Sequence, residues 1–328
     1  MNLLITGASG FIGFNLSKYL LKNTDFEIYG VDSLNNAYDN NIKNLRTAEL
    51  NAFEKFHFYN LDLSSEATYQ ELKSLEISCV VHLAARAGVR QSFLEPKKYI
   101  TDNTISTANL SSFIKNMKIE KFLIASTSSI YGDSGENKVK EVKDEKYPPP
   151  SVYATTKLSG ELLAKTILEG SNTSITIPRF FTVYGPYGRP DMSILRFIHW
   201  IYSGEEILLF GDGEQKRAFT FIDDVISALT LLIDTNENKT YNIGSNSQVS
   251  LINVIKKIET MLNKKAKINH LPRALKDVDV VIPDLSNMES LGWEPKVEID
   301  EGLSRTIDWY LENKEFLKNL RFEYDYEK

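Results

Sequence analysis

The chain has 328 residues and a net charge of −6, and its 42% hydrophobic and 25% charged residues are ordinary for a soluble globular protein. The negative charge gives no reason to expect nucleic acid or an anionic membrane as a partner, and the single cysteine, Cys79, excludes a disulfide or a cysteine metal site within the chain. No run approaches about 18 consecutive apolar residues, and residues 1–5 lead into a strand pattern, so we expect no membrane span, no cleavable leader and a cytoplasmic location.

The length suggests two domains, or one domain with a large appended lobe. Strand-like patterns alternate with helical stretches through the first half, which is typical of an α/β fold with a parallel, doubly wound sheet. We expect this domain to span residues 1–180, with a strand returning near residues 240–245. From Pro186 on, Gly, Pro and aromatic residues become frequent, so residues 181–328 are expected to form mainly a smaller mixed α/β lobe that binds the substrate.

Glycines follow the first apolar run, residues 3–5. Gly7, Gly10 and Gly13 lead into an amphipathic pattern at residues 14–21. Glycines let the backbone turn tightly and approach a pyrophosphate, whose charge is favoured at a helix amino terminus. The spacing is one residue longer than the commonest dinucleotide fingerprint, and a flexible loop is the alternative.

Asp32 ends a second predicted strand, residues 27–31. It lies about 20 residues after the glycines, where a carboxylate can accept hydrogen bonds from both ribose hydroxyls of a dinucleotide. This acid would repel a 2′-phosphate, so NAD is favoured over NADP; a surface aspartate in a turn is the alternative. The loop at residues 33–41 is rich in Asn and Tyr and is expected to wrap the adenosine end.

Further strands are predicted at residues 56–61, 80–85 and 121–125. Ligands of such sheets bind at the carboxyl ends of the strands, where small residues after the fourth strand would let a cofactor approach. His82 is expected to be a core histidine, since no second metal-type residue lies at ligand spacing, and no metal site is predicted. The hydroxyls of residues 126–129 are expected to face the cofactor crevice, although such a run is also typical of a turn.

Tyr153 and Lys157 lie four residues apart in a predicted helix, residues 151–165. Side chains at this spacing share one face of a helix. A cation within roughly 4–6 Å favours the phenolate form and lowers the pKa of a tyrosine. Tyr153 could therefore act as a base near neutral pH, although the same spacing also arises by accident in a chain with 16 tyrosines.

Taken together, these motifs resemble the extended short-chain dehydrogenase/reductase family of nucleotide-sugar enzymes, in order and across nearly the whole chain. Within the family the chain is most similar to UDP-glucuronate 4-epimerases, through residues 32–39, 87–90 and 181–192. The matching family positions are Thr6, Gly7, Gly10, Gly13, Asp32, Asp62, Leu63, His82, Leu83, Ala84, Ala85, Ser126, Thr127, Tyr131, Gly132, Tyr153, Lys157, Arg179, Phe180 and Phe181.

The resemblance implies a Rossmann fold with tightly bound NAD and a catalytic set of Thr127, Tyr153 and Lys157. Tyr153, as a phenolate favoured by Lys157, would take the proton of the sugar 4-hydroxyl while hydride leaves C4, and Thr127 would bind the same oxygen. The 4-keto sugar would then turn over and receive the hydride on its other face. The implied cofactor contacts are Gly7, Gly10, Phe11, Ile12, Gly13, Asp32, Asn35, Asp62, Leu63, Leu83, Ala84, Ala85, Tyr153 and Lys157.

Three positions separate the chain from related enzymes that catalyse other reactions. Similar 4,6-dehydratases carry Asp-Glu after the catalytic threonine, where this chain has Ser128 and Ser129. Similar decarboxylases carry an acid there and usually an asparagine at the position of Thr182. The resemblance therefore implies a 4-epimerase that interconverts UDP-glucuronate and UDP-galacturonate.

An epimerase of a uronate must keep the substrate carboxylate bound, because the 4-keto acid loses CO2 readily. Ser128 and Thr182 are expected to donate hydrogen bonds to that carboxylate, and Arg189 to supply charge. Arg217 is expected to meet the phosphates of the substrate. Arg90 is expected either to approach the sugar or the phosphates or to be a solvated arginine at the start of a helix. Ala218 replaces a usual aspartate of the family, and Arg273 is displaced from the family's phosphate-binding arginine.

Other readings remain open from the sequence. They are a 4-epimerase of UDP-glucose or a UDP-N-acetylhexosamine, a UDP-glucuronate decarboxylase, and an NAD-binding scaffold or sensor without catalysis. The resemblance also implies a homodimer, which the sequence permits and does not show.

Overall fold

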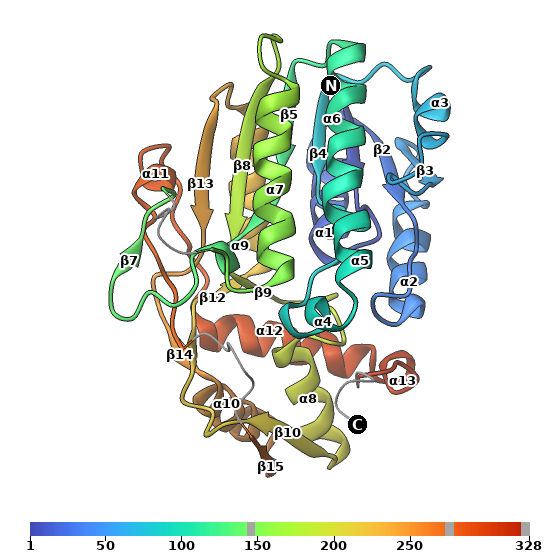
Figure 1. Ribbon diagram of the computed structural model, residues 1–328. Coiled ribbons are helices and arrows are strands. Elements are labelled where there is room, and N and C mark those ends of the chain that lie inside the picture. Colours follow the sequence, from blue (N-terminus) through green and yellow to red (C-terminus); the bar gives the residue numbers. More distant parts are fainter. Residues whose placement is uncertain (143–147, 273–278, 323–328) are drawn as a thin grey trace. The chain divides into compact units, whose positions relative to one another are not determined.

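The computed structural model describes residues 1–142, 148–272 and 279–322 (Figure 1). The chain forms two compact units, each assembled from separated segments. Unit 1 comprises Met1–Ile130, Asp144–Phe180 and Ile226–Tyr241, and unit 2 comprises Tyr131–Lys143, Phe181–Val225 and Asn242–Lys328. The chain thus passes into unit 2 after Phe180 but visits it once before and returns to unit 1 once afterwards.

Unit 1 is built on a parallel sheet with flanking helices. Its elements, including α9 and β13, which are shared with unit 2, are β1 (Asn2–Thr6), α1 (Phe11–Asn23), β2 (Glu27–Asp32), α2 (Asn40–Leu50), β3 (Phe56–Asn60), α3 (Thr68–Leu72), β4 (Cys79–His82), α4 (Val89–Leu94), α5 (Pro96–Tyr99), the π-helical turn η1 (Ile100–Ile105), α6 (Ser106–Met117), β5 (Lys121–Ile124), β6 (Ser126–Thr127), the 3₁₀ turn η2 (Ser128–Ile130), α7 (Val152–Ile167), β8 (Ser174–Phe180), α9 (Ile222–Asp234) and β13 (Lys239–Ile243).

The sheet has the strand order β13-β8-β5-β4-β1-β2-β3, and β6 also pairs with β8. The pairs between β1, β2, β3, β4, β5 and β8 are parallel. Helices α6 and α7 pack side by side on the face of the sheet that is in front in Figure 1, and α1 lies behind it. This arrangement confirms the predicted doubly wound α/β sheet, with β13 as the returning strand.

The hydrophobic core of unit 1 is formed largely by its central strands, which are apolar along their length. Leu4, Val80, Phe122 and Ile177 are fully buried and belong to one hydrophobic cluster, as expected for parallel strands covered on both faces. Cys79 is buried in β4, and burial raises the pKa of its thiol to about 12, so it is an inert core residue.

The fourth strand is shorter than predicted. It ends at His82, whereas the sequence predicts a strand to residue 85. The reason is that the backbone N–H of Ala84 donates to the side-chain oxygen Oγ1 of Thr6, at 3.2 Å, and leaves the ladder of backbone bonds. The small residues that follow β4 are thereby placed at the carboxyl end of the sheet.

Unit 2 combines short strands with three helices that pack on one another, α8 (Ser193–Ser203), α10 (Leu251–Leu262) and α12 (Ile299–Glu312). Across the part of the chain that the structure describes, no helix is long and apolar enough to span a membrane. The elements are β7 (Lys138–Val139), β9 (Thr182–Tyr184), α8 (Ser193–Ser203), β10 (Glu206–Phe210), β11 (Lys216–Arg217), β12 (Phe219–Phe221), β14 (Val249–Ser250), α10 (Leu251–Leu262), β15 (Lys267–Leu271), β16 (Ile282–Pro283), α11 (Ser286–Glu289), α12 (Ile299–Glu312) and α13 (Lys314–Leu317).

Candidate active site

The glycine turn between β1 and α1 packs too tightly for side chains. Gly7 has φ +70°, and a Cβ atom added to it would lie 2.7 Å from the backbone nitrogen of Ala84. A Cβ added to Gly13 would lie 2.1 Å from the carbonyl oxygen of Gly7. Helix α1 begins after Gly10, and no side chain caps its first N–H groups. Such a turn, with free N–H groups at a helix amino terminus, fits a dinucleotide pyrophosphate.

The carboxylate of Asp32 lies at the end of β2, beside this turn. It accepts hydrogen bonds from the backbone N–H groups of Ser9 at 3.1 Å and of Leu34 at 2.9 Å. Asn35 follows in the same loop, and its side-chain oxygen accepts from the N–H of Ala37 at 3.2 Å. The carboxylate is therefore held in place beside the glycine turn, and the contact of Asp32 and Asn35 with a cofactor stays a prediction.

Two buried cations on α2 hold this loop, and the sequence reasoning missed both. Lys43 donates to the backbone and side-chain oxygens of Asn35. Arg46, which is fully buried, donates to the carbonyl of Ser9 at 2.9 Å and to the hydroxyl of Tyr38 at 2.8 Å. Their spacing of three residues on one helix face was the available signal.

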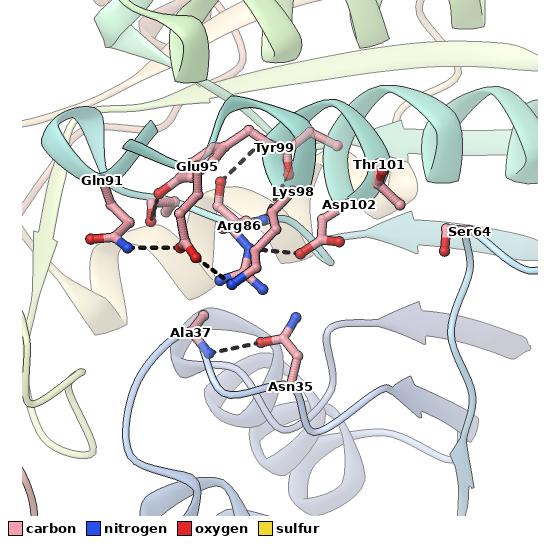
Figure 2. Close-up of polar contacts among 12 residues, drawn as sticks. Asn35, Ala37, Ser64, Arg86, Gln91, Glu95, Lys98, Tyr99, Thr101 and Asp102 are labelled. Carbon is pink, nitrogen blue, oxygen red and sulfur yellow. Dashed lines mark hydrogen bonds and ion pairs between the residues drawn. The ribbon is translucent and has the colours of Figure 1, made fainter. Parts of the chain in front are cut away.

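A further buried cation follows β4. Arg86 is 6% exposed and pairs with Asp102 at 2.7 Å. Figure 2 shows the side chains of Arg86 and Lys98 pointing toward Asn35 in the loop after β2. Arg86 directly follows the predicted contact Ala85, and positive charge at this place suits a phosphate-bearing cofactor.

Phe11 and Ile12, two further predicted cofactor residues, form the first turn of α1. The remaining ones outside α7 follow β4 or β3. Leu83 and Ala84 bond to Thr6 at the carboxyl end of β4, against the glycine turn, and Ala85 follows them. Asp62 and Leu63 follow β3. The Asp62 carboxylate accepts from the N–H and hydroxyl of Ser64, and Leu63 is 5% exposed within the core cluster.

Helix α7 carries the predicted base. Ser151 caps the helix by accepting from the N–H of Ala154 at 3.1 Å. The ring of Tyr99 packs edge-on against that of Tyr153, with centroids 6.3 Å apart. Lys157, one turn further on, is buried, and burial lowers its pKa from 10.5 to about 8, whereas the negative charge of Glu161 opposes this shift. A buried ammonium one turn from a phenol favours the phenolate.

Strand β6 and the turn η2 pack directly against α7. Thr127 on β6 is 6% exposed, and its hydroxyl oxygen accepts from the N–H of Ser129 at 3.2 Å. The three predicted catalytic residues therefore lie on neighbouring elements of unit 1. Contrary to expectation, Ser126 does not present its hydroxyl to the cofactor crevice, because that hydroxyl donates to the buried carboxylate of Glu161.

His82 is confirmed as a core histidine. It is fully buried, and its two ring nitrogens bond to the hydroxyls of Thr6 at 2.7 Å and Thr107 at 3.0 Å. Burial lowers its pKa to about 3, so the ring is neutral at physiological pH. Within the described ranges, no group of three or more His, Cys, Asp or Glu residues could hold a metal ion.

The predicted substrate residues are divided between the units. In unit 1, Arg90 lies in the first turn of α4 and Ser128 begins η2. In unit 2, Thr182 begins β9, next to Phe219 of β12. The contact of these three residues with substrate stays a prediction.

Two arginines of unit 2 already have partners within that unit. Arg189 forms a two-pronged ion pair with Asp191, which is 5% exposed. Arg217 donates to the carbonyls of Lys216 at 2.8 Å and Asp279 at 3.3 Å. Arg273 lies outside the described residues. A substrate anion at Arg189 would therefore have to share the guanidinium with Asp191.

Unit 2 also contains a cavity of about 400 Å³, and Lys216, the residue before Arg217, is one of the residues that line it. Pockets of this size hold small ligands. The lining residues are Gly135, Glu136, Phe210, Gly211, Asp212, Glu214, Gln215, Lys216, Gln248, Asp279, Val280 and Ile282.

Comparison with known proteins places these features in one group of enzymes. The pattern of the NAD dependent epimerase/dehydratase family matches residues 3–244. A UDP-glucuronate 4-epimerase of Thermodesulfobacterium geofontis is 41% identical over 97% of this chain and 98% of its own. The UDP-glucuronic acid 4-epimerase of Bacillus cereus, solved with UDP-glucuronic acid and NAD, has a TM-score of 0.89 and 34% identity over 95% of this chain and 99% of its own. The UDP-glucose 4-epimerase of Thermotoga maritima, solved with UDP-glucose, has a TM-score of 0.85 and 29% identity over 96% and 100%.

Proposed function

Because the chain belongs to the NAD dependent epimerase/dehydratase family, we propose that it is an NAD-dependent isomerase that interconverts UDP-glucuronate and UDP-galacturonate by epimerisation at C4. The observation that carries the proposal is the placement of Tyr153 one turn from the buried Lys157 on α7, beside the strand that holds Thr127. The similarity to UDP-glucuronate 4-epimerases extends over nearly the full length of the chain, which supports the choice of substrate.

Bound NAD supplies the acceptor for the C4 hydride and the donor for its return. The residues of the chain supply the proton transfer. Tyr153 removes the proton of the 4-hydroxyl and later gives it back, Lys157 stabilises the phenolate by its charge, and Thr127 hydrogen-bonds the reacting oxygen. Proton transfer of this kind contributes roughly 10²–10⁴-fold to a rate.

The residues after Thr127 favour epimerisation over dehydration. Elimination of water across C5 and C6 needs an acid and a base beside the sugar, whereas η2 presents Ser128 and Ser129, which do not ionise near pH 7. The 4-keto sugar therefore keeps its substituents until the hydride returns to its other face.

From the resemblance, Ser128, Thr182 and Arg189 are each expected to contact the substrate carboxylate. The hydroxyls donate hydrogen bonds, and Arg189 balances charge in competition with Asp191. This competition favours one alternative, a 4-epimerase of a neutral sugar such as UDP-glucose, because the charge of Arg189 is already balanced by Asp191.

Proton NMR of the purified protein with UDP-glucuronate and no added NAD tests the proposal. We expect UDP-galacturonate to form until the two sugars reach equilibrium. A Tyr153→Phe variant, purified in the same way, should show a rate lower by about 10²–10⁴-fold and controls for contaminating enzymes. UDP-xylose as the product would instead identify a decarboxylase, and turnover of UDP-glucose alone would identify the neutral-sugar epimerase.

The same proposal includes a cytoplasmic homodimer with a small-molecule substrate and without nucleic acid or a membrane as partner. Apolar side chains on neighbouring parts of unit 1 support self-association, since Ile105 on η1 is 43% exposed and Leu162 on α7 is 57% exposed. Light scattering on the eluting protein should give twice the mass of one chain, and a Leu162→Lys variant should shift it toward the monomer.

A further inference from the structure

A buried ionic cluster is formed by residues of β6, α7 and β8, and two of these elements, β6 and α7, carry the proposed catalytic residues. Arg179 binds Glu161 through two hydrogen bonds of 2.9 and 2.6 Å, and Ser126 donates its hydroxyl to the same carboxylate. The three residues are only 4%, 2% and 4% exposed. Burying a charge is costly unless it is paired and hydrogen-bonded, and here the carboxylate has both an ion-pair partner and a hydroxyl.

The cluster connects the elements that carry the catalytic side chains. Ser126 precedes Thr127 on β6 and lies opposite Arg179 of β8 in the strand register. Glu161 lies on α7, one turn after Lys157. One carboxylate therefore fastens the strand that carries Thr127 to the helix that carries Tyr153 and Lys157.

We propose that Glu161, held by Arg179 and Ser126, is a positioning residue that fixes α7 against β6 and keeps the Lys157 ammonium charged during the proton transfer. The inference rests on the proposed function, because it concerns how the Tyr153 base is maintained. A displacement of α7 by even a fraction of an ångström would alter the proton-transfer distance, to which general acid–base catalysis is sensitive.

The surroundings of Lys157 explain why a nearby negative charge matters. Burial disfavours its ammonium form, and Glu161 is the group that counteracts this effect. The other titratable groups near it are Tyr153 on α7, with Tyr99 of α5 packed on its ring, and His82 of β4, which is neutral near pH 7. On neighbouring elements, Asp102 of η1 is paired with Arg86, Lys115 of α6 donates to the carbonyl of Ile167 at the far end of α7, and Arg179 of β8 faces Glu161.

Glu161→Gln removes the charge and keeps the shape. With Arg179 still positive, the Lys157 ammonium then loses its stabilising neighbour, so its pKa should fall. We expect the basic limb of the kcat–pH profile to move to lower pH by about half a unit or more, kcat near pH 8.5 to fall about threefold or more, and KM to change less than about threefold.

Ser126→Ala tests the positioning role of Glu161 separately from its charge. This variant also provides the test if Glu161→Gln fails to fold. It removes the hydroxyl tie and leaves the charge, so kcat should fall about fivefold or more at every pH, without a shift of the basic limb. Ser111→Ala is the matched control, because Ser111 is another fully buried serine of unit 1 whose hydroxyl donates to a backbone carbonyl, that of Thr107, at 2.7 Å. This control should keep the parent kcat.

A second readout needs no turnover. In protein labelled with 13Cε-lysine, with Lys157 assigned from a Lys157→Met variant, the NMR titration should give a lower pKa for Lys157 in Glu161→Gln than in the parent. If the pKa of Lys157 differs in this way between Glu161→Gln and the parent, but the parent does not convert UDP-glucuronate, the proposed substrate is wrong and the inference on Lys157 stands. If folded Glu161→Gln has the parent titration and the parent kcat profile, or if Ser126→Ala behaves as Ser111→Ala does, the inference is overturned.

Discussion

Gly13 faces the carbonyl oxygen of Gly7 so closely that a Cβ atom added at Gly13 would lie 2.1 Å from that oxygen. The first turn of α1 is thereby seated on the glycine turn itself. No rotation of a side chain can relieve such a contact, because the backbone fixes the position of a Cβ atom and the carbonyl oxygen of Gly7 is itself a backbone atom. The position of the α1 amino terminus, where the pyrophosphate is expected, depends on the absence of a side chain at Gly13.

Gly13→Ala should therefore shift α1 away from the turn and weaken cofactor binding. We expect the NAD content of the purified variant, measured after acid release, to fall about tenfold or more, as the loss of one charge-assisted hydrogen bond would predict. Ser17→Ala, one turn further along α1, removes a fully buried hydroxyl and is the control. Full NAD content in Gly13→Ala would show that the turn does not bind the pyrophosphate.

The carboxylate of Asp32 should determine the choice between NAD and NADP. Asp32→Asn keeps an acceptor for the N–H of Leu34 but removes the charge that binds the ribose hydroxyls and repels a 2′-phosphate. In calorimetric titrations of cofactor-free protein, we expect about tenfold weaker binding of NAD and a smaller preference over NADP. Asp25→Asn, at an exposed ion pair with Lys55, should change neither affinity. An unchanged preference in Asp32→Asn would contradict the assignment.

His82 should make the protein less stable in acid. The unfolded chain binds a proton at this position below about pH 6.5, whereas burial lowers the pKa of His82 in the folded chain to about 3. As the pH falls from about 6.5 to about 3, His82 alone should therefore lower the free energy of unfolding by about 1.4 kcal/mol for each pH unit.

Urea denaturation across this pH range measures the effect. His82→Gln should be less stable near pH 7 but should show a flatter dependence on pH. His57→Gln, at a half-exposed histidine paired with Glu27, is the control and should keep the parent slope. A parent slope in His82→Gln would mean that other groups cause the acid sensitivity.

The ion pair between Arg189 and Asp191 should tune the preference for a charged sugar. Arg189→Met should lower kcat/KM for UDP-glucuronate by about tenfold or more and affect UDP-glucose much less. Asp191→Asn should have the opposite effect, because it leaves the charge of Arg189 to the substrate. Equal losses for both sugars in Arg189→Met would show that Arg189 supports the fold and does not contact the uronate.

The sequence was sufficient for the features that depend on local pattern. The glycine turn, Asp32 at the end of β2 and the spacing of Tyr153 and Lys157 on α7 all follow from short-range rules of strands, turns and helices. The bounds of β4 were wrong because its end is set by a bond between Ala84 and a hydroxyl 78 residues away.

The supporting residues of the site could not be found in this way. Glu161 and Arg179 are 18 residues apart, and Arg86 and Asp102 are 16 apart, so only the folded arrangement pairs them. The prediction that the hydroxyl of Ser126 faces the cofactor crevice is wrong for the same reason. A two-residue strand gives no clear alternation of its side chains, and the buried partner of this hydroxyl, Glu161, lies on another element.

The fate of the hydrogen at C4 tests the central claim most directly. UDP-glucuronate carrying deuterium at C4 can be incubated with the protein in ordinary water, and the UDP-galacturonate examined by NMR and mass spectrometry. Full retention of deuterium at C4 is expected, because the hydride leaves this carbon and returns to it without exchange with solvent. Replacement of the deuterium by solvent hydrogen, or a product with its C4 configuration unchanged, would contradict the account.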